Sequence, residues 1–377
     1  MLITFAVLSD QFCMLSKFFA IALPNCLASS VIVPDEYIWR NRSSSWFANR
    51  QEDSSSGNCP YLGESSYSSD SLATLVSDPL RYSQSTKLMA IFGSLGGVNW
   101  RRNDNWGQGD PCFQNWYGLI CDCDANVIGI QLVDNGLVGT IPNELGQLTH
   151  LTEIYLQSTQ RYSTGYSNPF MNRIAGSVPS LTNLLELTVL DISFNEIEFL
   201  PADIGSNLNL EVLSAAGNKL TSLPSNLGLL TRLRILELND NLISSIFPTS
   251  EICSLGNIYV LNLGNNSLSG TLYDTCLRGL DPLVFDVAGP HPTTIGSYSL
   301  LNGSLPKSLV DTWNNINQGY MSVYQQFGMS GDIPEACIDL RFCYTANFLS
   351  HGNLAWITGN PGDVPQVVYD TIALATQ

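Results

Sequence analysis

Residues 187–247 read LTVLDISFNEIEFLPADIGSNLNLEVLSAAGNKLTSLPSNLGLLTRLRILELNDNLISSIF. One pattern occurs three times in this stretch, because Asn195, Asn218 and Asn241 lie 23 residues apart and each ends a segment of the form LxxLxLxxN. The three segments are LTVLDISFN, LEVLSAAGN and LRILELNDN. Self-similarity at a period of this length indicates a protein built from stacked repeats.

The repeated leucines predict one short strand in each copy, with apolar side chains that point into a core shared with the neighbouring copies. The Asn that ends each copy is expected to bond backbone groups of the turn that follows the strand. One copy cannot bury its own apolar face, so the copies must stack. The pattern therefore predicts an α/β leucine-rich-repeat solenoid with a curved, parallel, concave sheet.

Further copies follow the same pattern less strictly, and they begin at Val127, Leu151, Ile258 and, weakly, Pro282. With a degenerate copy at about 320–334, we expect about seven to eight repeats over residues 127–335. Two copies are longer than the others, and their extra residues follow the strand at 160–171 and at about 290–298. Both insertions are expected to leave the solenoid on the same edge.

The composition is acidic, with 33 Asp and Glu residues, 16 Lys and Arg residues, and a net charge of −17. Nucleic-acid binding requires clusters of basic side chains that contact phosphate groups, and such clusters are absent from the sequence. We therefore expect no nucleic-acid partner, and we attribute the negative charge to solubility.

The sequence carries no signature of catalysis. The motifs G-x-S-x-G and H-E-x-x-H are missing, no phosphate-binding loop is present, and His150, His291 and His351 lie far apart. Cys121 and Cys123 form a C-x-C pair without a nearby His or a second pair, which favours disulfide bonding over a zinc site. We expect no enzyme activity, no cofactor and no metal.

The N-terminal segment has the features of a secretory signal. Residues 14–28 read MLSKFFAIALPNCLA, in which Lys17 precedes an apolar run and small residues precede a cleavage point after Ala28. An uncleaved signal anchor is the alternative, and it is the only expected means of membrane attachment because no later segment predicts a transmembrane helix. The protein is expected to be secreted or at the cell surface.

Residues 29–80 are rich in Ser and lack apolar periodicity. This composition predicts a disordered linker or a pro-segment, and an incorrectly predicted first exon is an alternative. Three N-x-S/T sequons fit a secreted protein, and they predict glycans at Asn41, Asn265 and Asn302.

Residues 81–126 are predicted to cap the first repeat. An amphipathic helix is indicated by Leu88, Ile91, Phe92 and Leu95, with Ser85 as its N-cap and Gly96-Gly97 as its end. Three tryptophans follow, and we expect them to cover the open apolar end of the stack as core residues, not as a ligand cage: Trp100, Trp106 and Trp116.

The segment DPC-x3-WYG-x2-C from Asp110 to Cys121, followed by G-x-I-P segments such as Gly139–Pro142 and Gly331–Pro334, resembles plant-type extracellular leucine-rich-repeat proteins. That family includes receptor-like kinase ectodomains and polygalacturonase inhibitors. The resemblance covers about residues 85–335 and implies the fold but no particular ligand. The middle copies instead use Leu-Pro segments, at Leu200 and Leu223, and depart from the plant pattern.

The cysteines predict disulfides in an oxidising compartment. Cys112 and Cys121 flank Trp116 in the cap motif, so we expect them to form the bond that pins the cap. Cys253 and Cys276 precede two successive repeats and are expected on neighbouring strands, about 4.8 Å apart; buried free thiols are the alternative. Two further cysteines are expected to hold a C-terminal cap within residues 336–377: Cys337 and Cys343.

Side chains between the two inner leucines of each copy point out of the concave sheet. They form a polar, partly acidic row: Gln131, Tyr155, Asp191, Ser214, Glu237, Asn262 and Asp286. We take the middle of this face, together with aromatic residues of the first insertion, as the most open patch and the candidate ligand-binding site, comprising Tyr155, Asp191, Phe194, Glu237, Asp240, Tyr162 and Tyr166. Simple solvation of exposed polar residues is the alternative.

These features favour an extracellular recognition module that binds a protein, a peptide or a cell-wall glycan, receptor-like but without a kinase domain in this sequence. A structural wall or matrix glycoprotein and an inhibitor of a secreted glycosidase are the alternatives.

We predict that the signal segment is removed between Ala28 and Ser29, because small residues stand before this bond and the apolar run ends there. N-terminal sequencing of secreted protein should begin at or near Ser29. An intact Met1 on protein retained in the cytosol would contradict the prediction.

Overall fold

The computed structural model describes most of the predicted cap and repeats. The described residues are 79–158, 169–247, 249–272, 276, 280, 284–287, 300–303, 320–322, 328–329, 343–345 and 356–357. The predicted signal segment and Ser-rich linker lie outside these residues, as do most of the two insertions.

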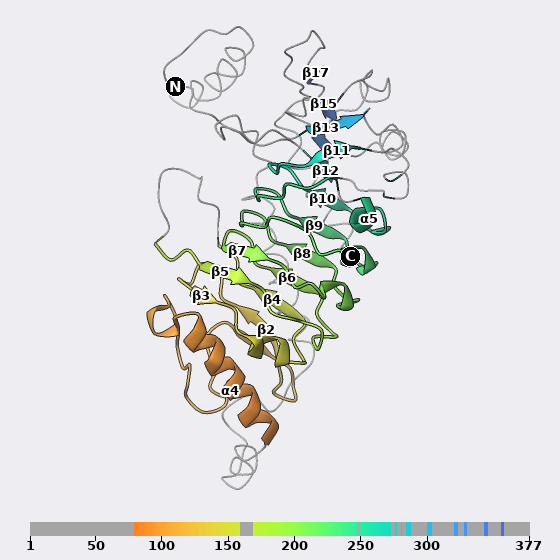
Figure 1. Ribbon diagram of the computed structural model, residues 1–377. Helices are drawn as coiled ribbons and strands as arrows, with labels where there is room; N and C mark the ends of the chain where they lie inside the picture. Colours follow the sequence, from red (N-terminus) through yellow and green to blue (C-terminus); the bar gives the residue numbers. More distant parts are fainter. Residues whose placement is uncertain are drawn as a thin grey trace, which may run out of the picture.

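A long sheet runs the length of the described repeats (Figure 1). Its central strands pair in parallel, each with the strand of the next repeat, and one antiparallel strand stands at either end. In spatial order the strands are β1 (Leu119–Cys121), β2 (Val127–Gln131), β4 (Glu153–Tyr155), β6 (Val189–Asp191), β8 (Val212–Ser214), β9 (Ile235–Glu237), β10 (Val260–Asn262), β12 (Val284–Asp286), β14 (Tyr320–Ser322), β16 (Cys343–Thr345) and β17 (Trp356–Ile357).

The strands occur where the LxxLxLxxN segments predict them, including the weak copy at β12 and the degenerate copy at β14. The sheet also continues past residue 335, where the sequence analysis places only a cap. There β16 pairs in parallel with β14, Met321 opposite Cys343, although its sequence lacks the leucine pattern.

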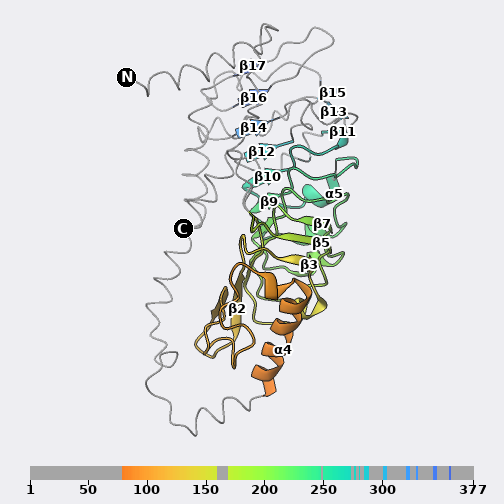
Figure 2. The ribbon, with the colours of Figure 1, turned by 90° about the vertical axis from the view of Figure 1, so that its left-hand side faces the viewer.

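Two short parallel sheets lie on the opposite side of the stack from the long sheet (Figure 2). One consists of β3 (Val138–Thr140), β5 (Arg173–Ser177) and β7 (Glu196–Phe199), and the other of β11 (Ser269–Thr271), β13 (Leu300–Gly303) and β15 (Gly328–Met329). Between them, the described residues of the repeats that begin at Leu210 and Leu233 form no strand of either short sheet. The 3-10 turns η3 (Ile204–Ser206) and η4 (Leu227–Leu229) follow the two Leu-Pro segments, and the short helix α5 (Thr249–Ile252) takes the corresponding place in the next repeat.

The helix before the repeats, α4 (Pro79–Ser94), begins seven residues before Thr86, the first helical residue if Ser85 were the N-cap. Ser85 is therefore inside the helix and is not its N-cap. The physical reason is Pro79, because proline lacks a backbone N–H and its fixed φ suits the first turn of a helix. The helix ends as predicted at Gly96, which adopts a left-handed conformation with φ 70° before the 3-10 turn η1 (Gly97–Asn99).

Helix α4 packs against β3, η1 and the 3-10 turn η2 (Asn143–Gln147). The side chain of Gln84 joins it to the first strand, because Nε2 donates to Ala125 O at 3.3 Å and Oε1 accepts from Val127 N at 2.9 Å. Lys87 Nζ also donates to Gln147 O at 3.0 Å.

The three tryptophans are core residues, as the sequence predicts. Trp106 lies between Trp100 and Trp116, with ring centroids 5.0 and 5.1 Å away. Each indole N–H donates to a backbone carbonyl, those of Leu95, Tyr117 and Gln108. All three rings belong to the same core as the repeat leucines, which extends from Leu88 to Leu301.

A ladder of buried asparagines connects the repeats. The Nδ2 atom of Asn218 donates to Ala215 O in its own repeat and to Ile192 O in the previous one, both at 3.0 Å. Its Oδ1 atom accepts from Ile197 N at 2.9 Å. The same contacts recur at Asn195, Asn241 and Asn266.

We predict that Asn218→Ala lowers the free energy of unfolding by about 2 to 4 kcal/mol, because buried carbonyl and amide groups lose their partners. Asn257→Ala is the matched control, since Asn257 is exposed and makes one bond, to Thr231 O at 2.7 Å. This control should cost less than about 1 kcal/mol. Guanidinium titration followed by circular dichroism measures both variants, and equal midpoints would refute the proposed importance of the ladder.

Candidate functional site

The predicted binding residues lie on the outer face of the long sheet, which we define as the face opposite the core leucines. Side chains alternate along each strand, so Leu190 enters the core while Val189 and Asp191 belong to the outer face. Parallel pairing without a register shift aligns these positions between strands. The resulting middle row contains Tyr155, Asp191, Ser214, Glu237 and Asn262.

The structure brings the middle row together as predicted but does not leave it open to solvent. Asp191 is 0% exposed and Glu237 is 5% exposed, and Tyr155 and Phe194 are also buried. The expectation of an open patch is therefore wrong for these four residues. Part of the reason is that short polar side chains on neighbouring strands bond to one another across the sheet.

These bonds form a polar chain over three strands. Ser193 Oγ lies 2.9 Å from Ser214 Oγ, and Ser214 Oγ donates to Glu237 Oε2 at 2.7 Å. The backbone N–H of Ser193 donates to Asp191 Oδ1 at 3.0 Å. The sequence analysis includes Ser214 in the polar row but misses Ser193, because the latter lies two positions further along its repeat.

A second row on the same face is apolar, and the sequence analysis does not single it out. It lies two residues before the middle row and contains β-branched side chains in four successive repeats: Val189, Val212, Ile235 and Val260. All four are buried. The signal was visible in the sequence, since a Val or Ile precedes the second leucine of every one of these copies.

A third row follows the strands, at the residue before each ladder asparagine. Five of its members have left-handed backbone conformations: Asp134, Phe194, Gly217, Asp240 and Asn265. Such a conformation is costly for residues other than glycine and is best tolerated by Asn and Asp. Two of these residues, in adjacent repeats, bond to each other: Asn265 Nδ2 donates to Asp240 Oδ1.

The first insertion is described only at its end. Tyr162 and Tyr166 lie outside the described residues, whereas Phe170 is 39% exposed and Arg101 lies over its ring with Cζ 5.2 Å from the centroid. Phe170 O also accepts from Gly136 N at 2.7 Å. The end of the insertion is thus tied to the first repeat and to the segment that follows α4.

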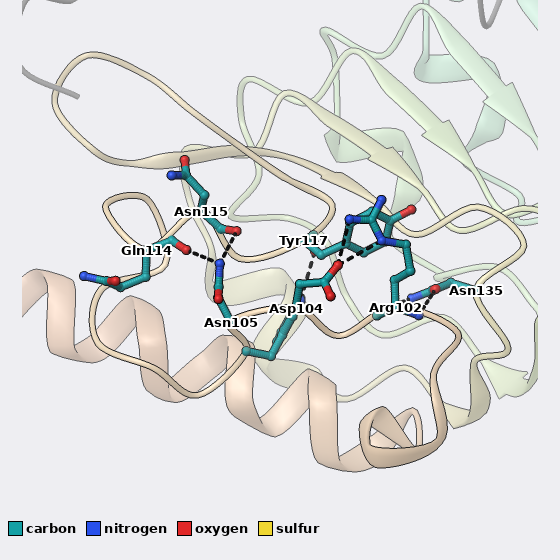
Figure 3. A network of polar contacts seen from close by, with 8 residues as sticks. Arg102, Asp104, Asn105, Gln114, Asn115, Tyr117 and Asn135 are labelled. Carbon is teal, nitrogen blue, oxygen red and sulfur yellow. Dashed lines mark hydrogen bonds and ion pairs between the residues drawn. The ribbon is translucent and has the colours of Figure 1, made fainter. Parts of the chain in front are cut away.

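A polar network surrounds Arg102 next to this contact (Figure 3). The guanidinium carbon of Arg102, Cζ, lies 4.0 Å from the centroid of the Tyr117 ring. Arg102 Nη2 forms an ion pair with Asp104 Oδ2 at 2.7 Å. The backbone N–H of Arg102 donates to Asn135 Oδ1, and Asn135 Nδ2 donates back to Arg102 O, both at 2.9 Å. The network joins the segment after α4 to the first repeat, and the ion pair within it adds little stability because it is about half exposed.

Both disulfide pairings expected in the described region are formed. Cys112 bonds to Cys121, with Cα atoms 5.8 Å apart, and Cys253 bonds to Cys276, with Cα atoms 5.1 Å apart. Cys123 is disulfide-bonded as well, so neither member of the C-x-C pair is a free thiol for zinc. The side chains of Cys337 and Cys343 lie outside the described residues.

The remaining predicted sites are only partly described. Asn41 lies outside the described residues, as does the side chain of Asn302, whose backbone belongs to β13. Asn265 is part-buried at the end of its strand. Within the described ranges, no group of three or more His, Cys, Asp or Glu side chains could hold a metal ion. The helices described here are all too short or too polar to cross a membrane.

Comparison with known proteins identifies plant receptor kinases as relatives. The receptor-like kinase TMK2 of Arabidopsis thaliana is 33% identical over 108 residues, which are 28% of this chain and 10% of TMK2. The receptor-like protein kinase BRI1-like 3 of the same plant is 37% identical over 101 residues, which are 26% of this chain and 7% of that kinase. The chain therefore matches a tenth or less of the length of these relatives. No family model matches it.

Solved structures share the fold. The Arabidopsis receptor kinase HAESA, in complex with the peptide hormone IDA and the co-receptor SERK1, matches with a TM-score of 0.52 and 21% identity over 70% of this chain and 44% of HAESA. The chain resembles plant extracellular leucine-rich-repeat proteins. A leucine-rich-repeat ectodomain, that of GASSHO1/SCHENGEN3 from Arabidopsis thaliana, matches with a TM-score of 0.51 and 24% identity over 70% of this chain and 32% of that ectodomain.

The leucine-rich-repeat resemblance inferred from the cap motif and the G-x-I-P segments is thus confirmed. The relatives and the disulfides agree with the extracellular location expected from the sequence. A plant ice-binding protein also matches, with a TM-score of 0.51 and 19% identity over 76% of this chain and 93% of that protein. The fold alone therefore does not decide the ligand.

We predict that Gly217→Ala destabilises the protein by about 1 to 3 kcal/mol, because Gly217 has a left-handed conformation that alanine adopts only with strain. An added Cβ would also lie 2.3 Å from Phe194 Cδ1. Gly256→Ala is the control, since a Cβ there meets nothing within 4 Å. Thermal unfolding of both variants tests this, and an unchanged midpoint for Gly217→Ala would contradict it.

Proposed function

We propose that this chain is an extracellular recognition module that binds a protein or peptide through the outer face of the long sheet, between β4 and β10. The observation that carries the proposal is the alignment of a polar row over five successive strands, with an apolar row beside it over four of them. An uninterrupted parallel register of this kind aligns equivalent positions of successive repeats into rows, and an extended ligand can follow such rows from repeat to repeat.

The comparisons support the proposal. Leucine-rich-repeat ectodomains are binding proteins, and the receptor HAESA and the ectodomain of GASSHO1/SCHENGEN3 were solved with a peptide hormone and with CASPARIAN STRIP INTEGRITY FACTOR 2, respectively. We infer a binding function without catalysis for the chain, and no finding favours a carbohydrate ligand.

Further parts of the proposal concern architecture. We propose that the repeats form a curved solenoid, and that α4, the tryptophans and the Cys112–Cys121 disulfide cap its first repeat. The contacts of α4 with β3 and η2 and the bonds of Gln84 to the start of β2 support this role. The structural-glycoprotein and glycosidase-inhibitor alternatives have no separate observation in their favour.

The test begins with capture of a partner, using the full secreted chain as bait in native extracellular material. We expect a defined protein or peptide in stoichiometric amounts. Insolubility without a partner would favour the structural alternative, and capture of a glycosidase would favour the inhibitor.

With that partner, Tyr155→Ala, Asp191→Ala and Glu237→Ala should each weaken binding about tenfold or more, as substitutions at the centre of an interface do. Glu198→Ala is the matched control, because Glu198 is an exposed carboxylate of β7 on the opposite side of the stack. Calorimetry on folded variants measures the effect. Equal affinity of all four variants would place the site elsewhere.

A further inference from the structure

We propose that the outer face between β6 and β9 contains a subsite for a cationic side chain on an aliphatic stem, such as that of arginine or lysine in a peptide. The stem would lie on the apolar row at Val212 and Ile235, and the charged group would bind at Glu237. This inference rests on the proposed function and names the chemistry of the ligand at one position.

The first step is the direction of the hydroxyl protons. Ser214 has one hydroxyl proton, and it is donated to Glu237 Oε2, because a carboxylate can only accept. The 2.9 Å contact between Ser193 Oγ and Ser214 Oγ must then use the proton of Ser193. Both serine protons are therefore committed within the chain, and neither hydroxyl can donate to a ligand.

The second step is the charge of Glu237. This side chain is 95% buried, and its one hydrogen-bond donor among the described residues is the neutral hydroxyl of Ser214. Neither ion pair formed between described residues, Arg102 with Asp104 or Lys219 with Glu196, involves it. A buried carboxylate needs a compensating charge or several donors, and a single neutral donor is a weak compensation.

The third step is an independent buried acceptor on the same face. Gln157 occupies in its repeat the position that Ser193 occupies in the next, and the two are adjacent because Ser158 N donates to Ser193 O at 3.0 Å. Gln157 is 9% exposed, and its Oε1 atom has no hydrogen-bond donor. Gln157 follows β4 and lies outside the subsite itself, so it shows a second unpaired acceptor on the same face, and Glu237 is the acceptor that a guanidinium or ammonium group would contact.

The fourth step is the apolar row beside these acceptors. Val212 and Ile235 lie two residues before Ser214 and Glu237 on the same strands, and their side chains are on the same face. Lysine and arginine pack their methylene stems on apolar surface while the charged head meets polar groups. An apolar row next to a buried carboxylate therefore fits these two side chains better than a small inorganic cation.

The test uses the full secreted chain and two small probes of nearly equal shape, N-acetyl-arginine amide and the neutral N-acetyl-citrulline amide. Ligand-observed NMR titration should give an affinity for the arginine probe that is about tenfold higher, in line with charge-assisted bonding, and that falls as salt is added. Equal affinity of the two probes would overturn the proposal.

Two variants locate the subsite. Glu237→Gln retains an acceptor for Ser214 but removes the charge, and it should abolish the preference for arginine over citrulline; Glu198→Gln on β7 is the matched control and should retain it. Ile235→Thr keeps a β-branched strand residue and should weaken binding of both probes several-fold without changing their ratio. A preference that persists in folded Glu237→Gln protein refutes the site.

The outcome is separable from the proposed function. If the wild-type chain captures a partner through Tyr155 and Asp191 but shows no preference for the arginine probe, the cationic subsite is wrong and the recognition function stands. If the chain prefers the arginine probe over the citrulline probe but captures no partner, the cationic subsite is supported and the proposed recognition of a protein or peptide partner is not.

Discussion

The side-chain amide of the ladder asparagine is the interaction on which the structure depends. Each repeat leaves its strand through a turn whose backbone groups would otherwise be buried without partners, and an unsatisfied buried peptide group is costly. Asn241 meets this need in two repeats at once, because it donates to Leu238 O in its own repeat and to Ala215 O in the previous one. The same residue thereby stabilises the turn of its own repeat and the contact with the previous repeat.

The ladder also determines what the outer face can be. Because every strand enters and leaves at the same position, residues such as Asp191, Ser214 and Glu237 stand opposite one another without a register shift. A residue type that recurs at one position of each repeat therefore forms a row of side chains across the sheet. The apolar row and the polar row are two such rows, and they lie side by side. The hydrogen bonds of Ser193 and Ser214 to the next strand form only because the polar row is aligned.

The sequence predicts those parts of the structure that depend on periodicity. It places the front strands of the repeats from β2 to β14, the ladder and the Cys253–Cys276 bond correctly, since each follows from position within a repeat. It fails where neighbouring side chains decide the result: the burial of Asp191 and the bond between Ser193 and Ser214 arise from contacts across strands that no single repeat encodes. The start of α4 at Pro79 was missed because the apolar period begins only later in the helix.

The back of the stack has a mechanical consequence. Strands β7 and β11 end the two short sheets, and the repeats between them are joined at the back by isolated backbone bonds, such as Lys219 N to Ile197 O at 2.8 Å and Leu242 N to Leu220 O at 2.9 Å. The front of the same repeats is continuous. Since each repeat contacts only its neighbours, a bending load is resisted least where one side has fewest bonds. Among the described repeats, we therefore expect bending to be easiest at β8 and β9, the strands that carry Ser214 and Glu237.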